Sequence, residues 1–475
     1  MKRGDEITIK LECFAYEGKS IAHVGGLVVF IVGGVPGDTV RARLTKIKKQ
    51  YAEAETLEVL MPSLLRVRPR CGYFGTCGGC TWQQVDYKAQ LEFKRRHVIE
   101  TLEHIGGFSG VEVKPTLGAD EIYFYRNKME FSFGERWLAK EEFQTVPRSR
   151  EPRGGVAQFA LGLHIPNRFD RVLDIEQCYL QSETSYRIVN AVRSFCIQRQ
   201  LSIYSTISHT GYLRNLVIRG SSRTQELMVN LVTSEDHPET MQAITGHLLE
   251  MFPLITTVVN NISQRKAQVA TGEREKVYHG PGFITERIGK RAYRVSANSF
   301  FQTNTTQAER LYDTALRLAQ LKPEDMVFDL YSGTGTIALH IADAANGVVG
   351  IESASPAVED ARRNASMNGV SNCTFLLGDL KDRLTKDNSW MEQYPKPNVV
   401  IVDPPRTGLH EKVAQSIVRL RPERIVYVSC NPATQARDLK LMCRESMYRI
   451  VDVQPVDMFP QTYHIENVVG LSLIV

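Results

Sequence analysis

The chain has 475 residues, 43% of them hydrophobic and 23% charged, and a net charge of +5 at pH 7. This is the composition of an ordinary globular protein with room for two to four domains, which excludes disordered and small disulfide-stapled classes. No apolar run reaches the roughly 20 residues that cross a bilayer, and the start Met1-Lys-Arg-Gly-Asp-Glu predicts no secretory signal. Nine cysteines in such a chain favour a cytoplasmic protein whose thiols serve chemistry.

Residues 1–62 are expected to form a small β-barrel. Ile7–Leu11 and Val40–Lys49 alternate apolar and polar residues, Leu27–Val32 is apolar, and the turn Gly33-Gly-Val-Pro-Gly37 separates strands. The second alternating stretch places cations on one face, where they could contact phosphate or simply be solvated. These cations are Arg41, Arg43, Lys46, Lys48 and Lys49.

Three cysteines crowd into the glycine-rich run Cys71-Gly-Tyr-Phe-Gly-Thr-Cys77-Gly-Gly-Cys80, and a lone Cys178 follows at a distance. Thiolates at this density suit an iron–sulfur cluster or zinc. The three-plus-one spacing favours a cluster over a zinc ribbon, which usually pairs two CxxC motifs. A disulfide is the remaining alternative from the residues alone.

Between the cysteine run and residue 290, the pattern indicates both helices and strands. Tyr87–Gly106 has a helical period, and residues 121–290 contain short strands and one clear helix. Leu161–His164 and Arg168–Cys178 form an expected strand pair. Arg126 and Lys128 alternate with apolar residues, an arrangement that could contact RNA or be a strand with one wet face.

From about residue 290 onward strands and helices alternate, which predicts a doubly wound domain with a parallel sheet. A helix is expected from a cap at Asn304 or Thr305 to Leu318, and another over Ile337–Asp343. The expected strands are Met326–Leu330, Val348–Ile351, Thr374–Leu377, Val399–Val402 and Ile425–Val428. The ligand of such a domain binds at the carboxyl ends of its strands.

The first of these strands enters the glycine-rich turn Tyr331-Ser-Gly333-Thr-Gly335, and Glu352 closes the next strand. A carboxylate there can accept both ribose hydroxyls of a nucleoside. The turn lacks the third glycine of a dinucleotide site and the GK[ST] of a P-loop, which favours a nucleoside without phosphates such as S-adenosylmethionine. Asp379 is placed either to meet the adenine or to cap a helix.

Two further motifs carry reactive groups. Cys430 ends a strand and precedes Asn-Pro, which favours a nucleophile over an inert buried thiol. Near the C-terminus, His464 and Glu466 lie two apart on an extended segment, and one of them could act as a base. The run Asp403-Pro-Pro-Arg406 places arginine where amine methyltransferases often carry a base-stacking aromatic residue, which argues against amine methylation.

Together the motifs resemble the RNA uracil-5-methyltransferase family over nearly the whole chain. Ser429-Cys-Asn-Pro-Ala-Thr434 is similar to its nucleophile motif and Phe459–Val468 to its base motif. Its cofactor motifs are matched by Asp403–Leu409, Asp329–Gly335 and Ser299–Asn304. The N-terminal stretch, through Gly18–His23, Val29–Val32 and Pro36–Val40, resembles the TRAM domain, an RNA-binding barrel.

The resemblance implies three units: a TRAM barrel (OB-like) at 1–62, a central α+β domain with an iron–sulfur cluster at 63–285, and a Rossmann-like methyltransferase domain at 286–475. It implies a [4Fe–4S] cluster on Cys71, Cys77, Cys80 and Cys178. S-adenosylmethionine would be bound by Gln302, Tyr331, Gly333, Glu352, Asp379 and Asp403. Cys13, Cys196, Cys373 and Cys443 match no motif and are expected to be structural.

The implied reaction is methylation of uridine C5 in RNA, with Cys430 as nucleophile and Glu466 as base. The barrel and the full cysteine motif are most like the members that act on ribosomal RNA, and transfer RNA is the alternative substrate. A non-catalytic RNA-binding or ribosome-assembly protein is the alternative of another class, against which intact Cys430 and Glu466 weigh. The expected protein is a monomer with RNA as its partner and no membrane or protein partner.

Overall fold

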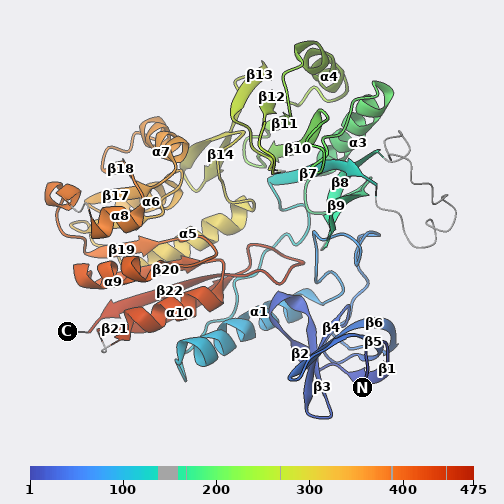
Figure 1. Cartoon of the computed structure of the whole chain (residues 1–475). Coiled ribbons are helices and arrows are strands. Elements are labelled where there is room, and N and C mark those ends of the chain that lie inside the picture. Colours follow the sequence, from blue (N-terminus) through green and yellow to red (C-terminus); the bar gives the residue numbers. More distant parts are fainter. Residues whose placement is uncertain (137–158, 167, 268, 387–388, 445–446, 475) are drawn as a thin grey trace.

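The computed structural model describes residues 1–136, 159–166, 168–267, 269–386, 389–444 and 447–474 (Figure 1). In this part of the chain three β-sheet units follow one another, with a β-hairpin between the second and the third. No helix of the described residues is long and apolar enough to cross a membrane.

The N-terminal unit is a curved six-stranded sheet. Its strands in spatial order are β1 (Glu6–Lys10), β5 (Thr39–Ile47), β6 (Tyr51–Met61), β4 (Leu27–Val32), β3 (Ser20–Val24) and β2 (Cys13–Phe14). The N–H of Glu12 donates to the carbonyl of Ile21 (2.8 Å), so the chain after β1 curls toward β3. The inward side chains, among them Ala22, Val29 and Val40, are completely buried, as the alternation predicts.

The cationic face of β5 is largely neutralised by its neighbours. Arg41 contacts Glu6 (3.2 Å) and Glu58 (2.8 Å), and Lys46 contacts Glu53 (2.7 Å). Arg43 also reaches Glu6. Such exposed pairs contribute little to stability, but they lower the positive potential that would attract phosphate. This arrangement favours the solvated-face interpretation for these three cations.

The central unit is a seven-stranded sheet that carries two helices, where the sequence indicated one. Its strands in spatial order are β13 (Arg274–His279), β12 (Thr257–Ile262), β11 (Leu227–Thr233), β10 (Leu213–Gly220), β7 (Lys128–Glu135), β8 (Phe159–Ile165) and β9 (Arg168–Asp174). Helices α3 (Glu183–Gln198) and α4 (Pro238–Met251) pack their apolar residues against this sheet in one core. The β8–β9 pairing confirms the expected strand pair, and Cys178 follows it.

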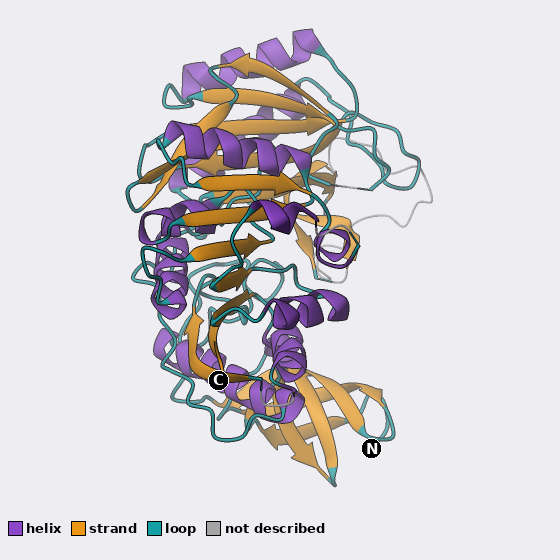
Figure 2. Cartoon of the chain, turned by 90° about the vertical axis from the view of Figure 1, so that its left-hand side faces the viewer, coloured by secondary structure: helices purple, strands orange, loops and turns teal. Residues whose placement is uncertain are grey.

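The C-terminal unit is a seven-stranded sheet with helices on both faces (Figure 2). Its strands in spatial order are β18 (Cys373–Leu377), β17 (Gly347–Glu352), β16 (Met326–Leu330), β19 (Val399–Val402), β20 (Arg424–Ser429), β22 (Glu466–Leu473) and β21 (Tyr448–Val456). The first five are parallel, but β22 runs antiparallel to both neighbours. The expectation of a purely parallel sheet is therefore wrong at this edge, because β21 and β22 follow one another without a crossover helix between them.

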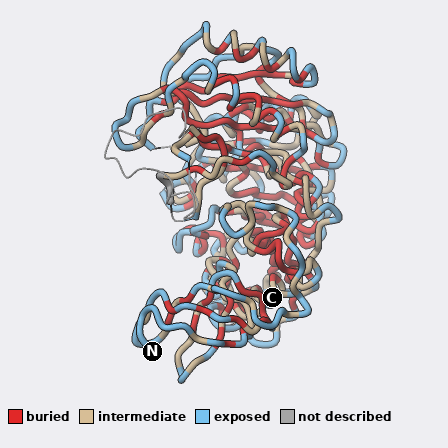
Figure 3. The backbone as a smooth tube through the Cα atoms, turned by 90° about the vertical axis from the view of Figure 1, so that its right-hand side faces the viewer, coloured by how far each residue is buried: buried red, intermediate tan, exposed pale blue. Residues whose placement is uncertain are grey.

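Two apolar cores fill the space on the two faces of this sheet. One face is covered by α5 (Thr305–Ala319), α6 (Thr336–Ile341) and α7 (Ser355–Met367), together with the hairpin β14 (Phe283–Ile288) and β15 (Arg291–Ser296). The other is covered by α8 (Leu380–Thr385), α9 (Glu411–Leu420) and α10 (Pro432–Met442). The expected cap of α5 is confirmed, since the Asn304 side chain accepts from the N–H of Gln307. Figure 3 shows buried backbone, in red, inside exposed outer segments, in pale blue.

Helix α1 (Tyr87–Thr101) and the π-helical turn Leu102–Gly106 confirm the expected helical stretch. The sequence places this stretch in the central unit. Its buried residues Val98 and Leu102 instead join the core beside α10, on the C-terminal sheet (Figure 1). Helix α1 therefore packs on the C-terminal unit, although it precedes the central unit in the sequence.

Candidate active site

The sequence-predicted site residues of the C-terminal unit gather at one edge of its sheet. Tyr331 and Gly333 follow β16, Glu352 ends β17, Asp403 follows β19, and Cys430 follows β20. These four strands are adjacent and parallel, so their carboxyl ends meet along one edge. This is where a doubly wound domain binds its ligand.

Glu352 is held by backbone amides. One carboxylate oxygen accepts from the N–H of Gly333 (3.2 Å), and the other from the N–H groups of Ser353 (2.8 Å) and Ala354 (2.9 Å). Tyr331 has φ +66°, a conformation that costs a non-glycine residue free energy and that clusters at functional sites. The turn is tight enough that a Cβ on Gly335 would lie 2.8 Å from the Phe375 ring.

The carboxyl groups of Asp329, Asp403 and Glu352 lie near one another behind this turn and interact electrostatically. Asp329 is completely buried, and burial together with Asp403 and Glu352 raises its pKa to about 7. Burial likewise raises the pKa of Asp403 to about 7. Removing like charges from water without a nearby cation makes each charge costly. The edge of the sheet is therefore suited to a positively charged ligand, as the sulfonium and amino groups of S-adenosylmethionine are.

Two of the predicted cofactor residues have other contacts as well. The carbonyl of Gln302 accepts from the Asn127 side chain (2.8 Å), which ties the β7 entry to the cofactor motif. Asp379 accepts from the N–H groups of Lys381 and Asp382 and caps α8, the alternative that the sequence left open. Its role toward the adenine stays a prediction.

Cys430 lies between the end of β20 and the start of α10. The Ser429 hydroxyl and the Asn431 backbone bond one another in both directions (3.1 Å), and the Asn431 side chain caps α10. Burial, with Glu466 and Asp403 nearby, raises the pKa of Cys430 to about 11. The thiol is therefore protonated at neutral pH in the ligand-free protein, and its activation requires a change on substrate binding.

Glu466 and Cys430 lie at the same end of the β20–β22 ladder. The last pair of the ladder joins Ser429 with Asn467, so Cys430 and Glu466 are the next residues along their segments. Their proximity is reflected in the pKa of Cys430, which the Glu466 carboxylate helps to raise. Glu466 is 4% exposed, and burial with Asp403 raises its pKa well above the usual carboxyl range.

His464 is a weaker candidate for the base. Burial, with Arg406 and two further cations nearby, lowers its pKa to about 4, so its ring is neutral at pH 7. The ring packs against Tyr463, with centroids 4.2 Å apart. Glu466 therefore has both the position near Cys430 and the raised basicity that removal of a proton at this site requires.

Arg406 is the cation of this site, a role the sequence did not assign. It lowers the pKa of both Cys430 and Glu466 and acts on His464 and Tyr16. Its carbonyl accepts from the side chain of Asn431 (3.0 Å), which joins the Asp403–Arg406 turn to the Cys430 loop. The sequence showed only that arginine replaces an aromatic residue here.

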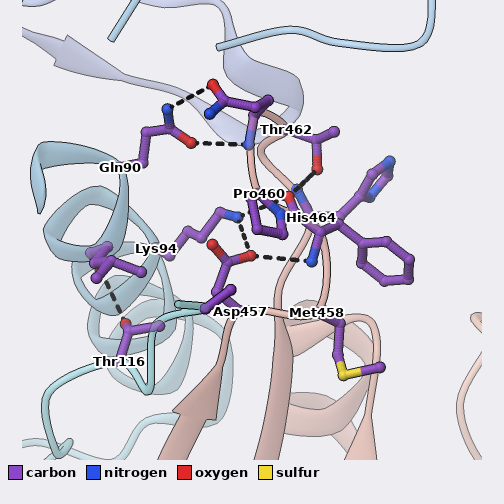
Figure 4. A network of polar contacts seen from close by, with 12 residues as sticks. Gln90, Lys94, Thr116, Asp457, Met458, Pro460, Thr462 and His464 are labelled. Atoms are coloured by element: carbon purple, nitrogen blue, oxygen red, sulfur yellow. Dashed lines mark hydrogen bonds and ion pairs between the residues drawn. The ribbon is translucent and has the colours of Figure 1, made fainter. Parts of the chain in front are cut away.

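A buried network holds the loop that carries His464 and precedes β22 (Figure 4). Lys94 of α1 contacts Asp457 (2.6 Å), and both side chains are completely buried. Asp457 also accepts from the N–H of Phe459 (3.0 Å). The Gln90 side chain donates to Gln461 Oε1 (3.1 Å) and accepts from the Gln461 N–H (3.0 Å). The contacts of α1 with this loop could not be read from residues more than 360 positions apart.

The four cysteines of the predicted cluster line one cavity. It lies between the Gly72–Gly79 turn and the residues after β9, and its lining includes Cys71, Cys77, Cys80 and Cys178. Burial, with other thiols of the group nearby, raises the pKa of Cys77 to about 11 and of Cys80 to about 12. All nine cysteines are described and free, so none is in a disulfide.

These thiols do not form a ready ion site. No group of three or more His, Cys, Asp and Glu among the described residues is placed to hold a metal ion. The donor set nevertheless fits a metal–sulfur centre, because four thiols line one cavity and neighbouring thiols of this group help to raise the pKa of Cys77, Cys80 and Cys178. Thiolates gathered in this way need a positive centre to offset their charges.

Comparison with known proteins identifies a matching family and sequence relatives of this chain. Residues 267–474 match the family model described as tRNA (Uracil-5-)-methyltransferase, and residues 1–57 match the TRAM domain. A protein from Chlorobaculum tepidum described as an uncharacterized RNA methyltransferase is 46% identical, over 98% of this chain and 96% of its own length. One of the same description from Porphyromonas gingivalis is 40% identical, over 96% and 98%.

A solved structure is similar over the whole chain. It is the Pyrococcus abyssi tRNA (uracil-54, C5)-methyltransferase in complex with S-adenosyl-L-homocysteine, at a TM-score of 0.74 and 29% identity. The match covers 98% of this chain and 100% of that one.

Proposed function

This chain belongs to the RNA (uracil-5-)-methyltransferase family, and we propose that it methylates C5 of a uridine through a covalent bond between Cys430 and C6 of the base. The observation that carries the proposal is that Glu466, the first residue of β22, lies beside Cys430, which directly follows the last β20–β22 pair, Ser429 with Asn467. A nucleophile and a base that lie this near one another can reach the neighbouring carbons C6 and C5 of one ring.

Each residue then has a defined task. The Cys430 thiolate forms a bond to C6, and the ring becomes an enolate with negative charge at C5. S-adenosylmethionine supplies an electrophilic methyl group to that carbon. Glu466 removes the C5 proton, the C5–C6 double bond forms again, and the bond to Cys430 breaks. Arg406 favours the thiolate, since it lowers the pKa of Cys430.

The carboxylates at the sheet edge support binding of the methyl donor. Glu352 is positioned by three backbone amides to accept from ribose hydroxyls, and Asp403 lies beside Cys430, where the sulfonium must arrive. Gln302, Tyr331, Gly333 and Asp379 are the further proposed contacts. A target base must leave its stack to enter such a site, so the substrate uridine is single-stranded or flipped.

We propose ribosomal RNA as the substrate, on the TRAM domain and the complete cysteine motif. Transfer RNA is the second candidate, because a tRNA uracil-5-methyltransferase matches this chain over 98% of its length. The test is to map 5-methyluridine in ribosomal and transfer RNA from cells with and without this protein. Loss of one ribosomal position supports the first candidate, loss of a transfer RNA position the second, and no loss in either contradicts methylation.

We further propose that Cys71, Cys77, Cys80 and Cys178 hold a [4Fe–4S] cluster. Four thiols that face one cavity support it. The cluster would link the turn before α1 to the segment after β9, and it has no task in the transfer of the methyl group. The proposed units are 1–62, 63–285 and 286–475, and the proposed location is the cytoplasm.

A further inference from the structure

The loop 297–304 connects β15 to α5 and carries Gln302, a proposed contact of the methyl donor. Two polar side chains of the central unit reach this loop from neighbouring strand ends. Asn127 directly precedes β7, and Lys128, the first residue of β7, pairs with Arg219 near the end of β10. A loop of the C-terminal unit is therefore held by side chains from another sheet.

Asn127 holds the second half of the loop through three hydrogen bonds. Its backbone N–H donates to the carbonyl of Thr303 (2.8 Å). Its side-chain amide donates to the carbonyl of Gln302 (2.8 Å) and to the hydroxyl of Thr305 (2.9 Å), which uses both amide hydrogens. These bonds fix the peptide groups that follow Gln302, and with them the backbone position from which its side chain leaves.

Arg219 holds the first half of the loop. Its Nη2 donates to the carbonyl of Ser299 (2.5 Å) and, at a longer distance, to that of Ala297 (3.4 Å). Arg219 is 3% exposed, and burial lowers its pKa to about 10, so the guanidinium stays charged at neutral pH. Hydrogen bonds from a charged donor are stronger than those between neutral groups, so the loop is tied firmly to β10.

The two strand ends are themselves fixed by the segment 180–181. The carbonyl of Leu180 accepts from the N–H of the residue before Asn127 (2.8 Å). The buried side chain of Gln181 donates to the carbonyl of the residue before Arg219 (3.0 Å). Both donors to the loop thus start from fixed backbone, which precise placement of a ligand contact requires.

The C-terminal unit contacts the loop on either side of Gln302. The Ser299 hydroxyl donates to Asp360 of α7 (2.5 Å), and the Asn304 side chain donates to the carbonyl of Met458 (3.2 Å). The carbonyl of Gln302 is bonded from the central unit, so the contacts of this residue depend on the central sheet.

We propose that Asn127 and Arg219 are positioning residues for the methyl donor, which hold the loop so that the Gln302 side chain meets S-adenosylmethionine. The inference rests on the proposed function, in which Gln302 is a donor contact. Both residues act through the backbone of the loop. The central unit thereby takes part in binding of the donor, although the other proposed donor contacts belong to the C-terminal unit.

The probe is S-adenosyl-L-homocysteine, whose affinity for the full-length protein is measured by calorimetry without RNA. The main variants are Asn127→Ala, Gln302→Ala and the two combined. Asn190→Ala is the matched control, because the Asn190 side chain also donates to a backbone carbonyl of the central unit, that of Glu176 (3.0 Å). Thermal unfolding of each ligand-free variant shows whether the fold is kept.

We expect Asn127→Ala and Gln302→Ala each to weaken binding about tenfold, the size of effect that one hydrogen bond accounts for. The combined variant should bind no more weakly than Gln302→Ala, because Asn127 acts through Gln302. Arg219→Met should also weaken binding, and Arg219→Lys should recover part of the loss because it keeps a charged donor. In turnover, Asn127→Ala should raise KM for S-adenosylmethionine more than it lowers kcat. Asn190→Ala should bind like the wild type.

Wild-type affinity in Asn127→Ala and Arg219→Met, with a loss in Gln302→Ala, would overturn the positioning role and leave the donor contact intact. Losses that add up in the combined variant would also overturn it, since the two residues would then act independently. Wild-type affinity in Gln302→Ala would instead contradict that contact of the proposed function, and the inference with it.

Discussion

Lys94 and Asp457, 363 positions apart, form an ion pair that is completely buried, with Nζ and Oδ1 2.6 Å apart. Lys94 also donates to the carbonyl of Phe459 (3.2 Å), and Tyr87 of the same helix donates to Asp457 (3.0 Å). Helix α1 thus fixes the loop that carries His464 and leads into β22, which begins at Glu466 (Figure 4).

Removal of one partner of this pair should displace the loop. Lys94→Met leaves Asp457 buried without a counter-charge, which typically costs about 3–5 kcal/mol. Lys94→Gln with Asp457→Asn keeps hydrogen bonds without charges and should cost less. We expect both variants to form the Cys430–RNA adduct but to release methylated RNA more slowly than the wild type, as followed by gel and by product release in single turnovers.

Lys114→Met is the matched control. Lys114 pairs with Asp452 and also links the segment after α1 to β21, but away from the loop. It should leave the ratio of adduct to released product unchanged. If Lys94→Met and Lys114→Met alter this ratio equally, the Lys94–Asp457 pair has no special part in placing Glu466.

Asp329 should reduce the stability of the ligand-free protein at high pH. Its folded pKa of about 7 lies above its ordinary value of about 3.9, so the stabilising protonated form is present at low pH and is lost as pH rises through 7. Asp329→Asn should raise the free energy of unfolding at pH 8 by about 4 kcal/mol and have little effect at pH 4. Thermal unfolding at both pH values checks this, with the exposed Asp120→Asn as control. A gain of equal size at both pH values would contradict the buried-charge account.

Formation of the adduct should depend on pH through Cys430. With a pKa of about 11, the thiolate fraction rises about tenfold per pH unit between pH 6 and 9. Arg406→Ala should raise this pKa further and slow adduct formation at pH 7, and higher pH should restore part of the rate. The measurement is the rate of adduct formation with 5-fluorouridine RNA. A pH-independent rate, or an Arg406→Ala rate equal to that of the wild type at pH 7, would contradict this assignment.

The cysteine cavity predicts a coloured protein. Anaerobically purified protein should be brown and contain iron and sulfide, and Cys178→Ala should lose the colour. Cys443→Ala, far away on the C-terminal unit, should keep it. Colourless protein that contains stoichiometric zinc would contradict the iron–sulfur cluster and indicate a zinc site instead.

Much of the C-terminal unit could be predicted, because buried parallel strands are short apolar runs. Met326–Leu330 and Val399–Val402 match β16 and β19 residue for residue. The antiparallel β22 could not be distinguished, since a buried strand has the same composition in either direction. The placement of α1 on this unit also depends on contacts over the whole length of the chain.

The candidate site, like the fold, could be predicted only in part from the sequence. Motifs indicated Cys430 and Glu466, but only the folded sheet shows that both lie at the end of the β20–β22 pairing and that Glu466 acts on the pKa of Cys430. Asp329 lay within a recognised motif, yet its complete burial, with Oδ1 lacking a hydrogen-bond partner among the described residues, emerges only from the packed sheet. The sequence showed that Arg406 replaces an aromatic residue, but not on which groups its charge acts. Those groups come from four loops that meet only in the folded protein.

The most direct test of the account separates Cys430 from Glu466. Each variant is incubated with S-adenosylmethionine and substrate RNA, and denaturing gels with mass spectrometry of the linked peptide detect the adduct. Glu466→Gln should accumulate a methylated adduct joined through Cys430, because addition needs only the thiolate whereas release needs the base. Cys430→Ala should give neither adduct nor methylation. If Glu466→Gln turns over normally while His464→Ala traps the adduct, the base is wrongly assigned, and methylation by Cys430→Ala would contradict the covalent mechanism itself.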